Sequence, residues 1–132
     1  GVIETLDRPR LADALKAEID KRGPGRTTRM LVEVNTGEEE QKGGVAPKDT
    51  GKLLRFCREQ AKMDIVGLMC IPPATEIPDM HFALLHKMSR ELSLPQLSMG
   101  MSADFETAIR YGATHIRVGT ALFGIRENIK AV

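Results

Sequence analysis

Five short apolar runs alternate with stretches of helical periodicity, and this alternation constrains the fold more than any other feature of the chain. The apolar runs are typical of strands and lie at residues 2–7, 30–35, 65–70, 96–101 and 115–120. The helical stretches lie at residues 11–19, 47–61, 80–92 and 103–111, and the tail from residue 121 is expected to be irregular or helical. Strands that alternate with helices predict parallel βαβ units with right-handed crossovers. Because the strands read as nearly continuous apolar runs, both faces of the sheet are expected to be covered.

The number of strands separates two architectures. A closed (β/α)8 barrel needs eight strands and about 250 residues, whereas this chain has 132 residues. An open, doubly wound sheet can be built from about five strands. The pattern alone therefore favours an open α/β sheet in one domain. One detail resists this interpretation, because the chain begins on a strand with no element before it.

Composition excludes several kinds of partner. The net charge is +1, aromatic residues make up 4% and tryptophan is absent, so we expect no nucleic-acid surface. No apolar run approaches the roughly 20 residues needed to cross a bilayer, so no membrane span is expected. Cys57 and Cys70 are predicted to be buried free thiols of a reducing compartment, which indicates a cytoplasmic protein. The histidines lack the spacing of metal ligands, so no metal site is expected.

Two of the apolar runs end in glycine and hydroxyl-bearing residues, and ends of this kind form phosphate sites. The first ends with Leu-Ser-Met-Gly-Met-Ser at 97–102, and the second with Arg-Val-Gly-Thr at 117–120. Glycine lets backbone N–H groups come close to an anion, and serine and threonine hydroxyls add donors. Arg117 lies two residues before the second glycine, so the ligand is expected to carry another polar group beside its phosphate. Neither a P-loop nor a dinucleotide-binding G-x-G-x-x-G pattern is present.

Five segments together closely resemble the pyridoxal-phosphate homeostasis proteins, the pyridoxal 5'-phosphate (PLP)-binding proteins of the alanine-racemase-like barrel group. The segments are VNTGEE at 34–39, QKGGV at 41–45, VGLMCIP at 66–72, LSMGMSAD at 97–104 and RVGTALFG at 117–124. The resemblance covers nearly the whole chain and keeps the order of the family's motifs.

This resemblance implies a different fold from the one that the strand count favours. It implies part of a (β/α)8 TIM barrel, about strands four to eight with their helices, with the N-terminal strands absent from this chain. Residues 1–132 are then the C-terminal part of a single PLP-binding barrel domain, without a second domain. The lysine that forms the Schiff base with PLP in this family is expected upstream of Gly1, because nothing in this chain matches its segment.

The resemblance also assigns residues to the cofactor. Those expected at the phosphate are Ser98, Ser102, Gly119 and Thr120, with Met101 supplying backbone or packing. Arg117 matches the arginine near the pyridine nitrogen, and Asn35 at a strand end is expected to face the ring. A guanidinium cannot accept a proton, so Arg117 leaves the pyridine nitrogen unprotonated and weakens the ring as an electron sink. Such an arginine is compatible with cofactor storage and with racemases of this fold.

The implied function is PLP binding and intracellular PLP homeostasis, by a carrier without established catalysis that passes PLP to apo-enzymes. The alternative is a PLP-dependent amino-acid racemase, which needs a second base, often a tyrosine. Tyr111 is the only tyrosine of the chain and lies near a helix end, which favours the carrier. A third alternative is a phosphate-binding isomerase or synthase barrel without PLP, against which the motifs argue.

Several of these residues also have an ordinary structural explanation. Ser102 is placed to cap the helix that follows, with Glu106 near the capping-box position. Arg117 could form a salt bridge, and Gly119 could serve a turn. Lys42 follows a strand end, but the three preceding glutamates at 38–40 favour its charged form, so we expect a solvated loop lysine that does not bind PLP covalently.

A barrel that lacks its first strands exposes two sheet edges. Open edges favour pairing with other strands. We therefore expect this chain to be held by the missing segment, or to self-associate across these edges.

Overall fold

The computed structural model describes residues 1–25 and 27–124 and contains a five-stranded parallel sheet. The strands pair in chain order, so that each strand lies beside the next one along the sequence. They are β1 (Val2–Leu6), β2 (Arg29–Glu33), β3 (Ile65–Met69), β4 (Gln96–Met101) and β5 (His115–Arg117). The five predicted strands are all present, and the βαβ prediction is confirmed.

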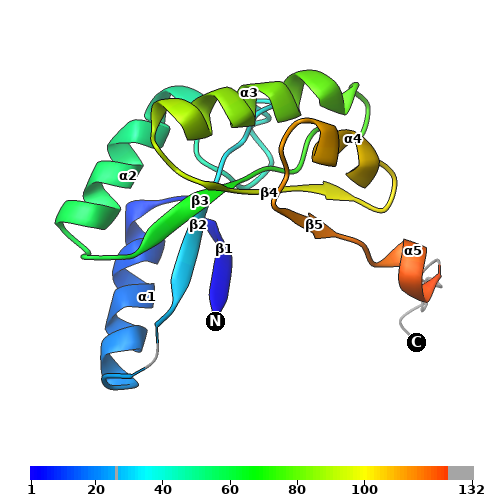
Figure 1. Ribbon diagram of the computed structural model, residues 1–132. Helices are drawn as coiled ribbons and strands as arrows, with labels where there is room; N and C mark the ends of the chain where they lie inside the picture. The colour runs from blue at the N-terminus through cyan, green and yellow to red at the C-terminus, as the bar shows by residue number, and fades with distance from the viewer. Residues whose placement is uncertain (26, 125–132) are drawn as a thin grey trace, which may run out of the picture.

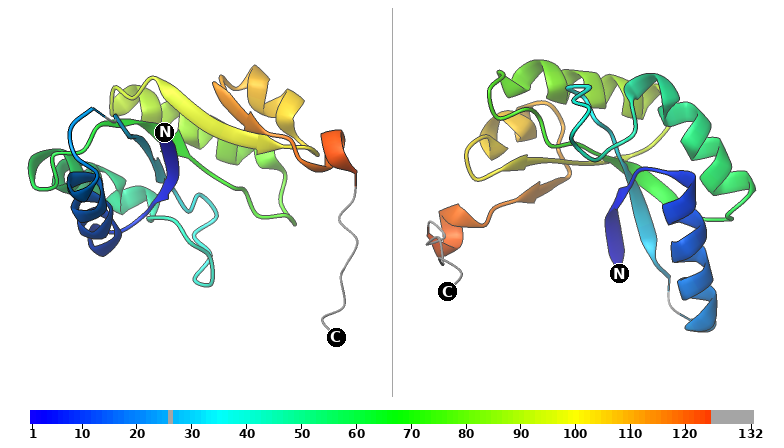
Figure 2. Two further views of the ribbon diagram at one scale, coloured as in Figure 1. Left: turned by 90° about the horizontal axis from the view of Figure 1, so that it is seen from below. Right: turned by 180° about the vertical axis from the view of Figure 1, so that it is seen from behind.

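The helices follow one another along one side of the sheet. They are α1 (Pro9–Lys21), α2 (Thr50–Glu59), α3 (Pro78–Glu91), α4 (Phe105–Arg110) and α5 (Thr120–Phe123), and the 3-10 helix η1 (Pro47–Asp49) precedes α2. Proline is the first residue of α1, η1 and α3, where its missing N–H has no helical acceptor and its fixed φ suits the helix. Figure 1 shows α1 to α4 arranged in an arc outside the curved sheet. In both views of Figure 2, α5 lies at the opposite end of the molecule from α1.

The strand order corrects the expectation of an open, doubly wound sheet. A doubly wound sheet reverses its strand order at a switch point and carries helices on both faces. In this chain the order runs from β1 to β5 without reversal, and α1 to α4 lie along one face of the sheet. The architecture is therefore a five-stranded parallel half-barrel, consistent with part of a TIM barrel. Strand count alone could not show this, because both folds repeat the same βαβ unit.

The hydrophobic core lies between the sheet and the outer helices. Val32, Leu68 and Met99 from the strands are fully buried there, together with Phe82 and Leu85 from α3. Phe82 and Leu85 are three residues apart and so lie on one face of the helix. Burial of these apolar side chains holds the helices on the sheet.

The inner face of the sheet carries a different set of residues. Glu33, Met69 and Ser98 are register partners across β2, β3 and β4, and partners in a parallel ladder point to the same side of the sheet. Arg117 lies two residues beyond His115, which pairs with Ser98, so it shares this side. The inner face therefore places acidic, hydroxyl and basic groups together. Met69 and Ser98 are both buried on this face.

Two local predictions from the sequence are wrong. The fifth strand ends at Arg117, and Thr120 opens helix α5 instead of ending a strand. Gly119 has φ −106° and ψ −64°, which takes the chain out of the extended conformation there. The N-cap residue of α4 is Asp104 and not the predicted Ser102. Asp104 Oδ1 accepts a hydrogen bond from the Met101 amide at 2.7 Å.

The two cysteines are free and buried, as predicted. Burial raises the pKa of the Cys57 thiol to about 11 and that of the Cys70 thiol to about 12. Both side chains are therefore neutral thiols at ordinary pH. Among the described helices, none has the length and apolar character needed to cross a lipid bilayer.

Candidate functional site

A cleft of about 910 Å³ lies at the carboxyl ends of the strands. Its walls come from the segments that follow β2, β3, β4 and β5, so residues far apart in the sequence meet there. The residues that line it include Lys42, Pro72, Gly100, Met101, Ser102, Gly119 and Thr120. Its volume is in the range of small-molecule sites, and barrel enzymes place their active sites at this end of the sheet.

Four of the residues singled out from the sequence line this cleft. Met101 and Ser102 come from the end of β4, and Gly119 and Thr120 come from the start of α5. β4 and β5 are neighbours in the sheet, so these two strand ends lie side by side at the cleft. A Cβ atom built on Gly119 would have nothing within 4 Å, so the backbone here is open to a ligand.

Arg117 and Ser98 lie together on the inner face, outside the residues that line the cleft. Arg117 Nη1 donates a hydrogen bond to Ser98 Oγ, and Nη2 donates to the carbonyl oxygen of Cys70 at 3.0 Å. The nearest acidic group is Glu4 of β1, whose Oε2 lies 3.9 Å from Arg117 Nη1. The guanidinium is thus held by groups from three different parts of the sheet.

Acidic side chains gather near Arg117 on the first two strands. Burial raises the pKa of Glu33 above its ordinary value of 4.5; Asp7 raises it further, and Arg117 opposes the shift. Asp7 Oδ2 also accepts a hydrogen bond from the amide of Gly44 at 3.0 Å. This contact ties the loop after β2 to the end of β1.

Asn35 lies at the end of β2 but bonds to its own loop. Its Nδ2 donates to the Glu39 carbonyl oxygen at 2.7 Å, and its Oδ1 accepts from the Glu39 amide at 3.2 Å. Asn35 is not among the residues that line the cleft. The structure therefore gives the amide a part in shaping the loop that carries Lys42, and contact with a cofactor ring stays a prediction.

Lys42 and the loop after β3 are parts of the cleft that the sequence did not single out as a site. Lys42 Nζ lies 3.6 Å from Glu39 Oε1, and 48% of its side chain is exposed, so it is a partly solvated loop lysine beside a carboxylate. It nevertheless brings a cation to the cleft wall. Pro72 and Pro73 form another wall. The double proline directly after a strand was the available signal for a rigid loop at this end of the sheet.

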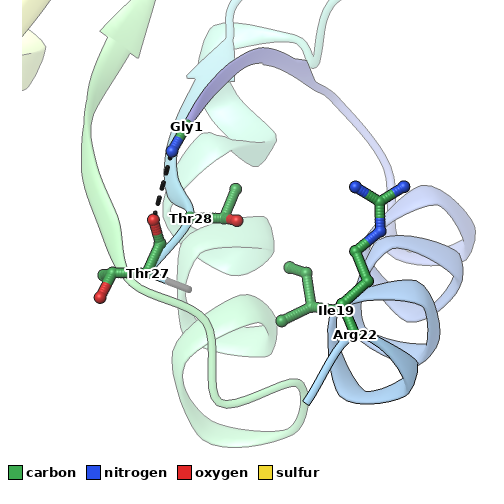
Figure 3. Close-up of a pocket in the computed structure, with 5 residues that line it drawn as sticks. All are labelled: Gly1, Ile19, Arg22, Thr27 and Thr28. Atoms are coloured by element: carbon green, nitrogen blue, oxygen red, sulfur yellow. Dashed lines mark hydrogen bonds between the residues drawn. The ribbon is translucent and has the colours of Figure 1, made fainter. Parts of the chain in front are cut away.

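A second, smaller cavity of about 260 Å³ lies at the opposite end of the sheet. Figure 3 shows Ile19 of α1 and Arg22, the residue that follows α1, on one side of it, and Gly1, Thr27 and Thr28 on the other. The Gly1 amine donates to the Thr27 carbonyl oxygen at 3.3 Å. The cavity lies at the amino ends of the strands, where barrels carry stabilising residues. Over residues 1–25 and 27–124, no group of three or more His, Cys, Asp or Glu side chains is arranged to hold a metal ion.

Comparison with known proteins assigns a family to this architecture. The family model "Alanine racemase, N-terminal domain" matches residues 1–127. The pyridoxal phosphate homeostasis protein of Aquifex aeolicus is 42% identical over 135 residues, a match that covers 96% of this chain and 58% of the relative. The human protein of the same name is 32% identical and matches 98% of this chain and 52% of its own length. The chain thus spans about half the length of these relatives.

Solved structures agree with this assignment. PipY of Synechococcus elongatus without PLP superposes with a TM-score of 0.83 at 32% identity, over 93% of this chain and 61% of PipY. PipY with PLP bound gives a TM-score of 0.76 at 30% identity, over 93% and 60%. The resemblance deduced from the motifs is confirmed, and the chain belongs to the alanine racemase N-terminal domain family.

Proposed function

We propose that this chain is the C-terminal part, about strands four to eight, of a single barrel domain that binds PLP and serves PLP homeostasis as a cytoplasmic carrier. The observation that carries the proposal is the meeting of Ser102, Gly119 and Thr120 in one cleft at the carboxyl ends of β4 and β5. The relatives named pyridoxal phosphate homeostasis protein, and PipY with its bound PLP, support the same conclusion.

The residues of the cleft fit the phosphate of PLP. Thr120 brings a hydroxyl, Gly119 leaves open space around its backbone, and Lys42 adds a positive charge to the wall. A phosphate is well held by hydroxyl and backbone donors with a cation nearby. PLP itself supplies an aldehyde that reacts with amines and a pyridine ring that accepts electron density.

In this proposal Arg117 faces the pyridine nitrogen. Its terminal nitrogens are both engaged by the protein, but a guanidinium has five N–H donors, so others remain for the ring. Because arginine gives up no proton, the ring nitrogen stays unprotonated beside it. This weakens the ring as an electron sink, which is compatible with storage of the cofactor and also with the racemases of this fold.

The second candidate, an amino-acid racemase, is less well supported. Tyr111, the one tyrosine, follows α4, and its hydroxyl donates to Asp79 Oδ2 at 3.2 Å. It is not among the residues that line the cleft. This half of the barrel therefore offers no tyrosine as a second base, in agreement with relatives that are named for homeostasis.

The test uses the intact protein with the residues that precede Gly1. The protein is loaded with PLP, reduced with borohydride and digested, and the modified lysine is located by mass spectrometry. We expect loss of the visible absorption band and one modified lysine upstream of Gly1. Pyridoxal, which lacks the phosphate, serves as the matched ligand and should bind more weakly.

Two results would contradict the proposal. One is an adduct confined to Lys42, and the other is equal affinity for PLP and pyridoxal. Rapid racemisation of alanine by the loaded protein would instead favour the racemase. Transfer of PLP to an apo-enzyme, measured by recovery of that enzyme's activity, tests the carrier role.

A further inference from the structure

The two serines of the LSMGMS segment occupy different places in the structure. Ser102 lines the cleft, whereas Ser98 is fully buried on β4 and bonds through Oγ to Arg117 Nη1. Residues in a strand advance by about 3.3 Å each, so about 10 Å of strand separates Ser98 from Met101 at the cleft. One phosphate group cannot reach both hydroxyls across that distance.

Ser98 and Cys70 together fix the plane of the Arg117 guanidinium. Nη1 is bound to the Ser98 hydroxyl of β4, and Nη2 to the Cys70 carbonyl that follows β3. Two contacts on the two terminal nitrogens of a planar group leave it little freedom to turn. The Cys70 contact is made by the main chain, so Ser98 is the side chain that sets this orientation.

A competing partner for Arg117 lies close by. Glu4 Oε2 is 3.9 Å from the same Nη1 that bonds to Ser98, and the two side chains are each about one quarter exposed. Removal of the serine hydroxyl frees Nη1 for this carboxylate. The opposite charge of Glu4 then draws the guanidinium toward β1.

We infer that Ser98 is a positioning residue that holds Arg117 against the ring nitrogen of PLP, and that it does not bind the phosphate. The inference rests on the proposed function. With Ser98 present, Arg117 occupies the place where a proton on the ring nitrogen would meet a positive charge. Without it, Arg117 turns away, and the ring nitrogen takes up a proton more readily.

The experiment compares Ser98→Ala with Ser102→Ala in the intact protein loaded with PLP that carries ¹⁵N in the ring. The ¹⁵N signal is followed as a function of pH, and the dissociation constant of PLP is measured separately. For Ser98→Ala we expect the ring nitrogen to take up its proton at higher pH than in the wild type, with PLP affinity changed less than about threefold. For Ser102→Ala we expect a loss of affinity of about tenfold or more and an unchanged ¹⁵N titration.

Ser98→Thr keeps the hydroxyl and should restore the wild-type titration. If Ser98→Ala does not fold, Ser98→Cys takes its place, because a thiol is of similar size and a weak acceptor. A Ser98 variant that loses affinity as Ser102→Ala does, with an unchanged ¹⁵N titration, overturns this inference alone. A wild-type protein that binds no PLP overturns the proposed function as well.

Discussion

Thr120 belongs to a helix and to the cleft at the same time. It is the first residue of α5, and it lines the same cleft as Ser102, which follows β4. Its hydroxyl is the group that the sequence predicted for the phosphate. At the level of single residues, the proposed site therefore depends on short polar side chains placed where two strands end.

Replacement of Thr120 by valine tests this hydroxyl without a change of shape. A hydrogen bond to a charged group contributes about 1.5 to 3 kcal/mol, so we expect PLP affinity to fall roughly 10- to 100-fold. Equilibrium dialysis against PLP measures the change. Thr27→Val makes the same chemical change at the opposite end of the sheet and should leave the affinity unaltered. Equal losses of PLP affinity in both variants would exclude a specific role of the Thr120 hydroxyl in binding.

Glu33 gives a pH-dependent prediction at the same scale. Burial, together with Asp7, raises its pKa above 4.5, so folding favours the neutral carboxyl. The stability that this group contributes is present below 4.5 and is lost as the pH rises through the raised pKa. Glu33→Gln removes that loss. We expect the free energy of unfolding of the variant to rise relative to that of the wild type as the pH increases above 4.5.

Urea denaturation at several pH values measures this difference. Glu59→Gln, an exposed position at the end of α2, is the control and should follow the wild type at every pH. If the stability of Glu33→Gln changes with pH in the same way as that of the wild type, then burial and Asp7 do not disfavour the charged form of Glu33 in the folded chain.

At the scale of elements, α4 packs closely on the end of β4 because of one glycine. Gly100 has φ +99°, and a Cβ built on it would lie 2.6 Å from the Ala108 Cβ and 3.1 Å from the Phe105 Cα. Both atoms belong to α4 and cannot easily move. Glycine at this position allows the helix to lie directly beside the strand end that forms the cleft.

Gly100→Ala should therefore destabilise the chain. An unfavourable φ and an overpacked contact together are expected to lower the free energy of unfolding by about 2 to 5 kcal/mol. Gly51→Ala is the matched control, since Gly51 lies in α2 with nothing within 4 Å of a built Cβ, and it should be neutral or slightly stabilising. Urea denaturation of the two variants tests the difference, and equal stabilities would refute the close contact.

The elements also show how far the sequence could be interpreted. Apolar periodicity located all five strands because hydrophobic pattern is a local property. It extended β5 too far, since Val118 and Thr120 favour strands and the helical turn at Gly119 has no sequence signal of its own. The position of the ends of β4 and β5 side by side followed from the sequential parallel strands. The hydrogen bond between Ser98 and Arg117 could not be predicted from the sequence. It depends on which face of each strand carries the residue and on the reach of a long side chain.

At the scale of the whole molecule, the half-barrel has two edge strands, β1 and β5. Val2 on β1 is 49% exposed and Ile116 on β5 is 36% exposed. Edge strands with exposed apolar side chains are templates for pairing with another chain. We therefore propose that the chain of 132 residues self-associates through these edges.

Sedimentation velocity over a range of concentrations tests this proposal. We expect the mass to rise with concentration, and Ile116→Lys to reduce the association because a charge on an edge strand opposes pairing. Ile109→Lys is the control, since Ile109 is 53% exposed but lies on α4. A wild-type chain that stays monomeric at all concentrations would rule out association through the edges.

The contact between Arg117 and Glu4 has a geometric consequence. β1 and β5 are the outermost strands of the sheet, yet Arg117 Nη1 lies 3.9 Å from Glu4 Oε2. The five-stranded sheet is therefore curved so strongly that side chains of its two edge strands meet across the inner face. A half-barrel whose curvature is already set leaves an opening of fixed width between its edge strands β1 and β5. In the proposed barrel, the remaining strands would join a sheet that is already curved and need not bend it themselves.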